Sequence, residues 1–420
     1  MQAMFDSVRS VLGEARTVAV ERGDPRYAPH RTPLVHALPQ SIEEAAEVVR
    51  AAFRDRFAIV PVGGNTDPRT GDPDAPPFCL LSTENLDRIT AYEPGDQTMT
   101  LEAGVSVAAA ARAAAKDRLR LAFSPPEPER ATVGGVIAAA TEGPTAAALG
   151  LVRDQLLGVL VVTGDGKLAK AGGRVVKNVT GYDLVRLYAG SRGALAVILE
   201  TTVRLRPMPE SLRRGVFPFA DERSALAAGL AVRAKTEGPA RLAVFGGAAT
   251  VELGISAHWA LVVEAEGFAQ SARAAVLAAA ALIDVDGQET SLPVDAGLPF
   301  VAPEEVAVVR VTMPPDHWTT HRESVGAALG APVGVVHDLL RGVRDTWHDP
   351  AARIWGDDRV LDTALTAAGA TLARPRDPGF HREMLRRLPG QTPGGLAQMR
   401  ALKTAFDPAG ILNPGRTIFG

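Results

Sequence analysis

Residues 171–210 constrain the fold of this chain more than any other segment. They combine a glycine pair, a polar turn at Lys177, a Tyr182-Asp183 pair and a Gly-Ser-Arg-Gly turn that runs straight into an apolar stretch. Glycine is needed where the backbone adopts positive φ or approaches a ligand closely. An apolar run directly after such a turn predicts a buried strand that holds the turn in place. The block therefore predicts a cofactor held largely by main-chain groups.

Two more glycine turns lie upstream, at 63–66 and 132–135. The first follows a predicted strand at 58–62, and successive small residues after a strand supply the converging N–H donors that a diphosphate needs. The second opens a predicted helix whose Ala138 and Ala139 would let a flat ring lie against the backbone. Either turn alone is compatible with tight packing, but three together favour a cofactor site. No G-x-G-x-x-G opens a helix and no G-x-x-x-x-G-K-[ST] is present, which disfavours a Rossmann site and a P-loop.

Composition narrows the class of protein. The 420 residues carry a net charge of −3, which gives no basic face for nucleic acid. The single cysteine, Cys79, excludes an internal disulfide framework and an iron–sulfur cluster held by this chain alone. The N-terminus lacks an apolar signal core, and no apolar run reaches the roughly 18 residues of a membrane span. We expect a cytoplasmic protein that reaches the inner face of a membrane only through partners.

Periodicity predicts an α+β chain. A helix and a polar connector are expected over 1–30, and irregular structure over 313–380, with polar turns at Trp347-His348-Asp349. The remaining pattern is strand, helix, strand. Strands are expected at 34–38, 58–62, 78–81, 88–93, 98–103, 156–163, 168–171, 240–245, 259–264 and 306–312, and helices at 41–54, 106–116, 132–140 and 270–282.

The order of motifs resembles the vanillyl-alcohol-oxidase (PCMH) type of flavoprotein. The motifs are G-G-N-T after a strand, T-V-G-G, V-K-N-V-T-G-Y-D-L, G-S-R-G-A-L-A-V-I-L-E and a terminal F-D-P-A-G-I-L-N-P-G-R. Within that family the block around Lys177 is most similar to the FAD-binding subunit of bacterial glycolate oxidase. The resemblance covers about 30–210 and 402–416. It implies an N-terminal helix and connector (1–29), a two-subdomain FAD-binding domain (30–208), an α+β cap (209–380) and a C-terminal segment that returns to the flavin (381–420).

The resemblance also implies a set of residues that hold FAD. Gly63, Gly64, Asn65 and Thr66 would bind the pyrophosphate. Along the ribityl chain and the ring would lie Pro125, Thr132, Gly134 and Gly135, with Gly143 and Arg153 closing the groove. The adenine end would be shaped by Gly190, Gly193, Val197 and Ile198, and Asn413 would approach the flavin ring.

Two departures from the family pattern matter. Relatives that tether flavin covalently have a histidine in the pyrophosphate loop, whereas this chain has Asn65 and Thr66, so we expect non-covalent FAD. The segment 143–148 lacks the basic residues that such subunits often carry, which weakens the case for tight flavin binding.

The sequence contains few candidate catalytic or metal-binding residues. The metal cluster H-x-G-D-G-N-x-H of related catalytic subunits is absent, and His317 and His321 are interpreted as a surface pair, so no metal is expected. Lys177 could hold an anion and Tyr182 could donate a proton to a developing alkoxide, so these two are the catalytic candidates, although either could simply stabilise the joint between strand and helix.

Three functions remain open. The leading hypothesis is an FAD-binding subunit of a glycolate-oxidase-like complex that relays electrons to or from a catalytic flavoprotein subunit and an iron–sulfur subunit. The first alternative is a self-sufficient FAD-dependent oxidoreductase for a small hydroxy acid or alcohol. The second is a non-catalytic scaffold.

Overall fold

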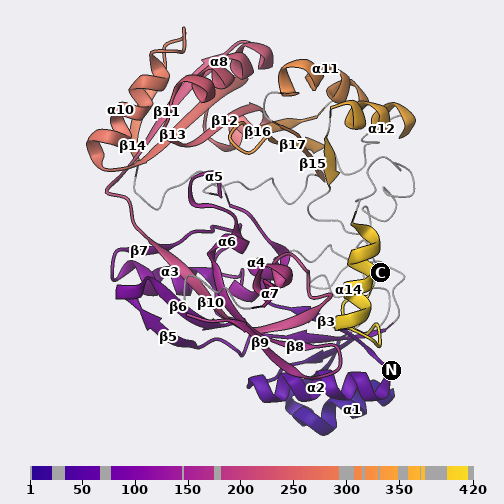
Figure 1. The fold of residues 1–420 in the computed structure, drawn as a ribbon. Helices are drawn as coiled ribbons and strands as arrows, with labels where there is room; N and C mark the ends of the chain where they lie inside the picture. The colour runs from indigo at the N-terminus through magenta and orange to yellow at the C-terminus, as the bar shows by residue number, and fades with distance from the viewer. Residues whose placement is uncertain are drawn as a thin grey trace.

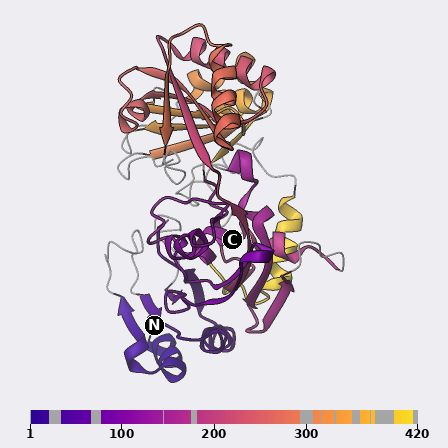
Figure 2. The same cartoon turned by 90° about the vertical axis from the view of Figure 1, so that its left-hand side faces the viewer.

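A computed structural model describes residues 2–20, 34–66, 77–143, 146–174, 181–292, 307–314, 317–329, 332–348, 358–368, 370–373 and 395–414. Strands and helices alternate through three sheets, which confirms the α+β prediction. Figure 1 shows two halves, with two sheets in the lower half and one large sheet in the upper half. The side view in Figure 2 shows the upper half stacked above the lower one.

The first sheet has four strands in the order β1-β2-β4-β3, and β4 pairs in parallel with both β2 and β3. The helices α1 and α2 accompany this sheet and pack against each other. The elements are α1 (Gln2–Leu12), β1 (Thr17–Val20), β2 (Leu34–Ala37), α2 (Ile42–Asp55), β3 (Ala58–Val62) and β4 (Phe78–Ser82).

Local sequence explains why α2 forms where it does. Ser41 is the N-cap, and its side chain accepts a hydrogen bond from the backbone N–H of Glu44. Glu43 and Glu44 place negative charge in the first turn, where the helix dipole favours it. Arg56 ends the helix in a left-handed conformation. The predicted helix is therefore confirmed to within a residue at each end.

The second sheet is antiparallel, in the order β5-β6-β10-β8-β9, with β7 pairing along β10. Its strands are β5 (Ile89–Glu93), β6 (Thr98–Glu102), β7 (Leu119–Leu121), β8 (Leu156–Thr163), β9 (Leu168–Gly172) and β10 (Ala196–Pro207). The helices that belong to it are α3 (Val107–Ala115), α4 (Val133–Ala139), α6 (Val152–Gln155) and α7 (Leu184–Tyr188).

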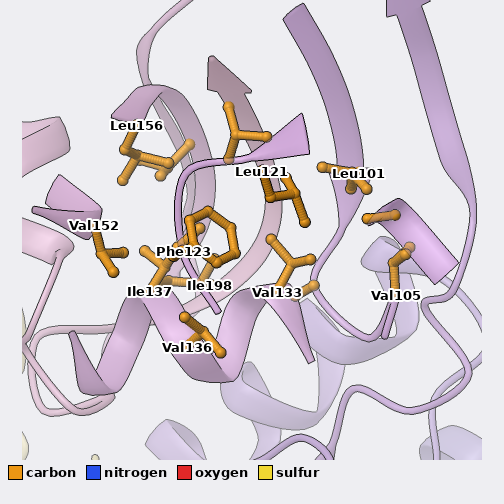
Figure 3. Packing of buried hydrophobic residues seen from close by; sticks show 14 of the residues in the cluster. Leu101, Val105, Leu121, Phe123, Val133, Val136, Ile137, Val152, Leu156 and Ile198 are labelled. Carbon is orange, nitrogen blue, oxygen red and sulfur yellow. The ribbon is translucent and has the colours of Figure 1, made fainter. Parts of the chain in front are cut away.

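One hydrophobic core of the lower half lies between the second sheet and helix α4. Val133 and Ile137 project from α4 toward Leu101, Phe123 and Ile198, as Figure 3 shows, and Val136 belongs to the same buried cluster. The intervening positions of α4 carry only glycine and alanine. The helix therefore has one apolar packing face and one bare face, which is formed by Gly134, Gly135, Ala138 and Ala139. The bare face carries no side chain larger than a methyl group, so it can approach other backbone closely.

The upper half is built on an eight-stranded sheet in the order β14-β11-β13-β12-β16-β17-β15-β18, with antiparallel pairing throughout the described strands. The helices α8 and α10 pack on one face of this sheet. The strands are β11 (Ser211–Phe219), β12 (Pro239–Gly247), β13 (Trp259–Gly267), β14 (Gln288–Leu292), β15 (Ala307–Thr312), β16 (Gly334–Asp338), β17 (Val343–His348) and β18 (Thr371–Ala373). The helices are α8 (Glu222–Lys235), α9 (Ala248–Glu252), α10 (Ala269–Ala280), α11 (Trp318–Leu329) and α12 (Asp358–Ala367).

The chain returns to the lower half at its end. Helix α14 (Leu396–Phe406) lies beside the lower half in Figure 1. A short bridge then pairs Leu412 with Ile59 of β3. The last described residues therefore belong with the first two sheets.

Three sequence-based expectations were wrong. The region 1–30 is not a helix followed only by a connector, because β1 follows α1 and pairs with β2; residues 21–33 lie outside the described part. The region 313–380 is not irregular where it is described, since it contains α11, α12 and three strands. His348 lies inside β17 and is buried rather than in a polar turn. Long-range strand pairing provides order there that weak local periodicity does not reveal.

Helices long and apolar enough to cross a membrane are absent from the described residues.

Candidate functional site

A cavity of about 140 Å³ lies where the first two sheets meet the C-terminal segment. It combines the end of β3, the bare face of α4, the turn before β10 and the last described residues of the chain. Its lining consists of Pro61, Val62, Gly63, Thr83, Ala103, Gly134, Gly135, Ala138, Ala139, Arg192, Gly193, Val197, Ile198 and Asn413. Most of these residues are small or apolar, so main-chain groups form much of the wall.

The bare face of α4 supplies one side of the cavity. Thr132 caps this helix, and its Oγ1 accepts a hydrogen bond from the N–H of Gly135. Gly134 allows close contact with the end of β6, because a Cβ there would lie 2.5 Å from the Cβ of Ala103. A Cβ on Gly135 would meet only Thr132 Oγ1, at 3.0 Å. Packing explains Gly134, whereas at Gly135 the open space of the cavity begins.

The turn after β3 is packed against the loop before α4. A Cβ on Gly64 would lie 1.6 Å from the carbonyl oxygen of Arg130, and a Cβ on Gly63 would lie 2.1 Å from Thr132 Oγ1. Asn65 adopts a left-handed conformation with φ of 51°. Gly64 is therefore required by the proximity of the Arg130 backbone and Gly63 by that of the Thr132 side chain, and a substitution at Gly64 would disturb the fold itself.

The turn at 190–193 closes over the end of α4. The N–H of Gly190 donates to the carbonyl of Ile137, and the N–H of Arg192 donates to that of Ala138. Gly190, Arg192 and Gly193 all have positive φ, which for arginine is a strained conformation. Arg192, in this strained turn, is the one charged residue among the described residues that line the cavity.

The C-terminal segment completes the wall. Ile59 donates its N–H to the carbonyl of Ile411, and Asn413 donates its N–H to the carbonyl of Ile59, so the segment adds to the edge of β3. The side-chain Nδ2 of Asn413 donates to the carbonyl of Arg192. Its Oδ1 is buried and has no hydrogen-bond partner within the described structure. A buried acceptor of this kind fits a ligand that donates an N–H or O–H group.

The structure brings together part of the predicted site. The predicted residues that line the cavity are Gly63, Gly134, Gly135, Gly193, Val197, Ile198 and Asn413. The predicted residues outside the lining are Gly64, Asn65, Thr66, Pro125, Thr132, Gly143, Arg153 and Gly190. Sequence reasoning missed Pro61, Thr83, Ala103 and Arg192 as lining residues. Of these four residues, only Arg192 could have been recognised from the sequence, because it lies inside the Gly-Ser-Arg-Gly turn.

The residues outside the lining have other positions. Gly143 packs on Ser124, where a Cβ would lie 2.5 Å from the serine Oγ. Arg153 is exposed on α6. Tyr182 has 93% of its surface exposed and does not line the cavity, which gives it no position from which to act as an acid there. Lys177 lies outside the described residues.

A second group of polar residues lies on one face of the eight-stranded sheet. The strand register places Glu264 opposite both Arg214 and Arg241, so the three side chains form a row on one face. Glu264 Oε1 accepts from Arg214 Nε at 2.7 Å. Burial lowers the pKa of Arg241 to about 10. The next strands on this face add the pair Arg310–Asp345, with both hydrogen bonds at 2.7 Å.

This charged face is turned toward the lower half. Glu266 shares the face of Glu264, two positions along β13, and it forms an ion pair with Arg120 of β7 in the second sheet. Glu142 follows shortly after α4, the helix that forms one side of the cavity. Its carboxyl group interacts electrostatically with Arg341, which lies in the hairpin between β16 and β17. Burial raises the pKa of Glu142. Cations and carboxylates of the upper sheet therefore face the half that contains the cavity.

Comparison with protein families identifies both ends of the cavity-bearing half. Residues 33–172 match the FAD binding domain, and residues 382–417 match the C-terminal domain of FAD linked oxidases. The chain therefore contains a match to an FAD binding domain and a match to the C-terminal domain of FAD linked oxidases. The cofactor implied by these matches is FAD, and the lining suits the part of FAD that a space of about 140 Å³ can hold: small residues surround the space, a cation lines it, and the buried Asn413 Oδ1 can accept a hydrogen bond from a flavin N–H or a ribityl hydroxyl.

The curated relatives of this chain carry the names of enzymes that act on different compounds. A D-2-hydroxyglutarate dehydrogenase from Xanthomonas citri pv. viticola is 35% identical over 184 residues, 44% of this chain and 39% of that protein. Glycolate oxidase subunit GlcE from Escherichia coli is 35% identical over 179 residues, 40% of this chain and 49% of the subunit. A D-lactate dehydrogenase from Archaeoglobus fulgidus is 27% identical over 90% of both chains. The alignment thus spans less than half of the first two relatives.

The fold is that of PCMH-type flavoproteins. The crystal structure of p-cresol methylhydroxylase with substrate bound superposes with a TM-score of 0.75 at 16% identity, covering 99% of this chain and 96% of that one. At this identity the similarity establishes the fold alone. It confirms the predicted resemblance to this type of flavoprotein.

Proposed function

We propose that this chain is an FAD-binding subunit of a glycolate-oxidase-like complex, which holds FAD non-covalently and relays electrons to or from a catalytic flavoprotein subunit and an iron–sulfur subunit. The observation that carries the proposal is the lining of the cavity. Apart from Arg192, the described lining residues have no titratable side chain, so none of them can act as a base on a bound hydroxy acid. Bound FAD would supply the acceptor for a hydride or electrons.

Within this proposal, Gly135, Gly193, Val197 and Ile198 contact the cofactor through main chain and apolar surface, and Asn413 accepts a hydrogen bond from it. The turn at 63–66 remains the proposed pyrophosphate site. Arg130 supports that site, since its Nη2 lies 3.4 Å from the carbonyl oxygen of Gly64 and brings positive charge to the turn. The charge and the small residues suit a diphosphate.

Non-covalent attachment follows from the side chains at the cavity. No histidine or cysteine is among its described lining residues. Cys79 is buried in β4, and burial raises its pKa to about 12, which keeps the thiol protonated and unreactive. Acid precipitation of the yellow protein should leave all flavin in the supernatant. Flavin retained in the pellet would contradict this part of the proposal.

The second candidate is a self-sufficient oxidoreductase for a small 2-hydroxy acid. The charged row Arg214–Glu264–Arg241 favours it, because arginines on the face turned toward the cavity-bearing half can hold a carboxylate. The relative from Archaeoglobus fulgidus, matched over most of both chains, bears the name of a D-lactate dehydrogenase.

One experiment separates the two candidates. The purified chain, loaded with FAD, is incubated with glycolate, D-lactate or D-2-hydroxyglutarate and an artificial electron acceptor. The relay proposal expects no turnover by the chain alone, and turnover after co-purified partners from the native host are added. Turnover by the chain alone, lost in Arg241→Gln, would establish the second candidate. A chain that binds no FAD would support the scaffold alternative instead.

A further inference from the structure

The ammonium group of Lys403 is the centre of a buried cluster in α14. Its Nζ donates hydrogen bonds to Asp407 Oδ2 at 2.6 Å, to the carbonyl of Leu412 at 2.6 Å and to the carbonyl of Ala194 at 2.9 Å. The side chains of Lys403 and Asp407 are 12% and 0% exposed. All three donor positions of the ammonium are therefore used.

Asp407 holds the segment that follows the helix. Its Oδ1 accepts from the N–H of Ile411 at 3.0 Å, and its Oδ2 accepts from the N–H of Leu412 at 2.8 Å. Those two residues lie against β3, where Ile59 pairs with Leu412. One buried ion pair therefore shapes the stretch that delivers Asn413 to the cavity.

The same cluster reaches the opposite wall of the cavity. Ala194, which accepts from Lys403, immediately follows Arg192 and Gly193, and both of those residues line the cavity. Asn413 donates to the carbonyl of Arg192 in the same turn. Two hydrogen bonds from the C-terminal segment thus hold a strained turn, and the turn and Asn413 are adjacent parts of one wall.

We propose that Lys403 is a positioning residue that couples docking of the C-terminal segment, residues 395–414, to cofactor binding. The segment contributes to the cavity only while it is docked, so a cofactor that contacts the assembled wall stabilises the docked state. By reciprocity, a change that weakens docking lowers the affinity for FAD by the same free energy. The coupling depends on neither the substrate nor the partner subunits.

The reciprocal effect is tested first on the unmodified chain. Backbone amide hydrogen exchange is followed by mass spectrometry with and without saturating FAD, on peptides that cover 395–414 and, as a control, α8 in the upper half. We expect FAD to slow exchange in 395–414 by about tenfold or more and to leave α8 unchanged. Equal exchange in 395–414 with and without FAD would overturn the coupling.

Variants then test Lys403 itself. Lys403→Met is compared with Lys167→Met, which removes a similar pair with Asp165 at 2.6 Å in the neighbouring turn, where the lysine is 81% exposed. Lys403→Met should raise the Kd for FAD about tenfold, the equivalent of one lost hydrogen bond to a charged group, and Lys167→Met should not change it. Binding is measured by flavin fluorescence at a temperature where circular dichroism shows both variants folded.

A double variant separates positioning from simple stability. Lys403→Met alone leaves the buried carboxylate of Asp407 uncompensated, which destabilises the fold. Lys403→Met with Asp407→Asn removes that charge, so the Tm should recover while the weakened FAD affinity persists. Wild-type FAD affinity in the double variant, or in Lys403→Met with a lowered Tm, would show that the cluster only stabilises the fold.

Discussion

The side-chain amide of Asn413 donates a hydrogen bond to the main-chain oxygen of Arg192, joining segments 221 positions apart. Both residues line the cavity, and both have positive φ. The contact explains how a C-terminal motif and an internal glycine turn, which are unrelated in local sequence, come to line one cavity. It also supplies the sites at which the proposal can be tested.

Gly135→Leu should abolish FAD binding without unfolding the chain. Its Cβ would meet only Thr132 Oγ1, so the fold has room for a side chain, but that side chain would occupy the space of the cavity. We expect the Kd for FAD to rise at least 100-fold in fluorescence titrations and the Tm of the FAD-free protein to stay within a few degrees of wild type.

Gly64→Ala is the variant with which Gly135→Leu is compared. Its Cβ would lie 1.6 Å from the carbonyl oxygen of Arg130, so we expect a loss of about 2 kcal/mol or more in the free energy of unfolding in urea. A stable Gly135→Leu variant with normal FAD affinity would refute the placement of the cofactor in this cavity.

Arg192→Gln should weaken FAD binding by about tenfold, because Arg192 is the charged residue among the described residues that line the cavity and FAD is an anion. The loss should shrink as salt is raised, since salt already screens the interaction in the wild type. Titrations at low and high ionic strength measure both effects.

The control for Arg192 is Arg112→Gln. Arg112 is 63% exposed and pairs with Glu129 on the surface, so its replacement should leave the Kd for FAD unchanged at either ionic strength. Similar losses in the two variants would show that general charge, rather than the cavity, sets the affinity.

Glu142→Gln should change how stability depends on pH. Burial raises the pKa of Glu142 above its ordinary value, although its carboxylate accepts a hydrogen bond from the N–H of Val152 at 3.2 Å. The native state therefore keeps this proton to higher pH than the unfolded state does, and its contribution to stability is lost as pH rises through that window. The variant lacks this loss, so its stability relative to wild type should increase with pH.

Urea unfolding at several values between about pH 4 and pH 7 measures this difference. A difference between Glu142→Gln and wild type that does not change with pH would count against a raised pKa of Glu142.

The pair Arg120–Glu266 should couple the two halves of the molecule. Arg120 Nη1 donates to Glu266 Oε2 at 2.9 Å, and the side chains are 17% and 15% exposed. Removing either partner leaves a poorly solvated charge, so Arg120→Gln or Glu266→Gln should each cost about 2 kcal/mol. The double variant should cost less than the sum of the two. Additive losses in urea unfolding would show that the pair is not coupled.

Local sequence was sufficient for much of the fold. Ser41 with Glu43 and Glu44 marks the start of α2, and the apolar runs at 58–62 and 156–163 are strands with the predicted bounds. Capping and short apolar runs depend on neighbours in sequence, so they can be read there. The strands β16 and β17 were missed because they contain buried charged residues: Asp345 pairs with Arg310 on β15, and Asp338 pairs with Arg341 in the hairpin between the two strands.

The lining of the cavity was predicted only in part for a related reason. The glycine turns were recognised, but at Gly63, Gly64 and Gly134 the glycine is needed because another backbone or side chain lies where a Cβ would be. Thr83 and Ala103 carry no distinguishing pattern at all. Their place in the lining comes from the way the ends of β4 and β6 meet α4.

By itself the sequence determined the class of this protein: glycine turns after strands, a capped helix of small residues and the C-terminal motif are local features, and they identify an FAD-binding chain. Tertiary structure alone decided which of those features meet. It brought Asn413 to Arg192, buried Lys403 beside Asp407 and turned the row Arg214–Glu264–Arg241 toward the cavity-bearing half. These contacts depend on strand order and on the direction of side chains across long separations, and local periodicity encodes neither.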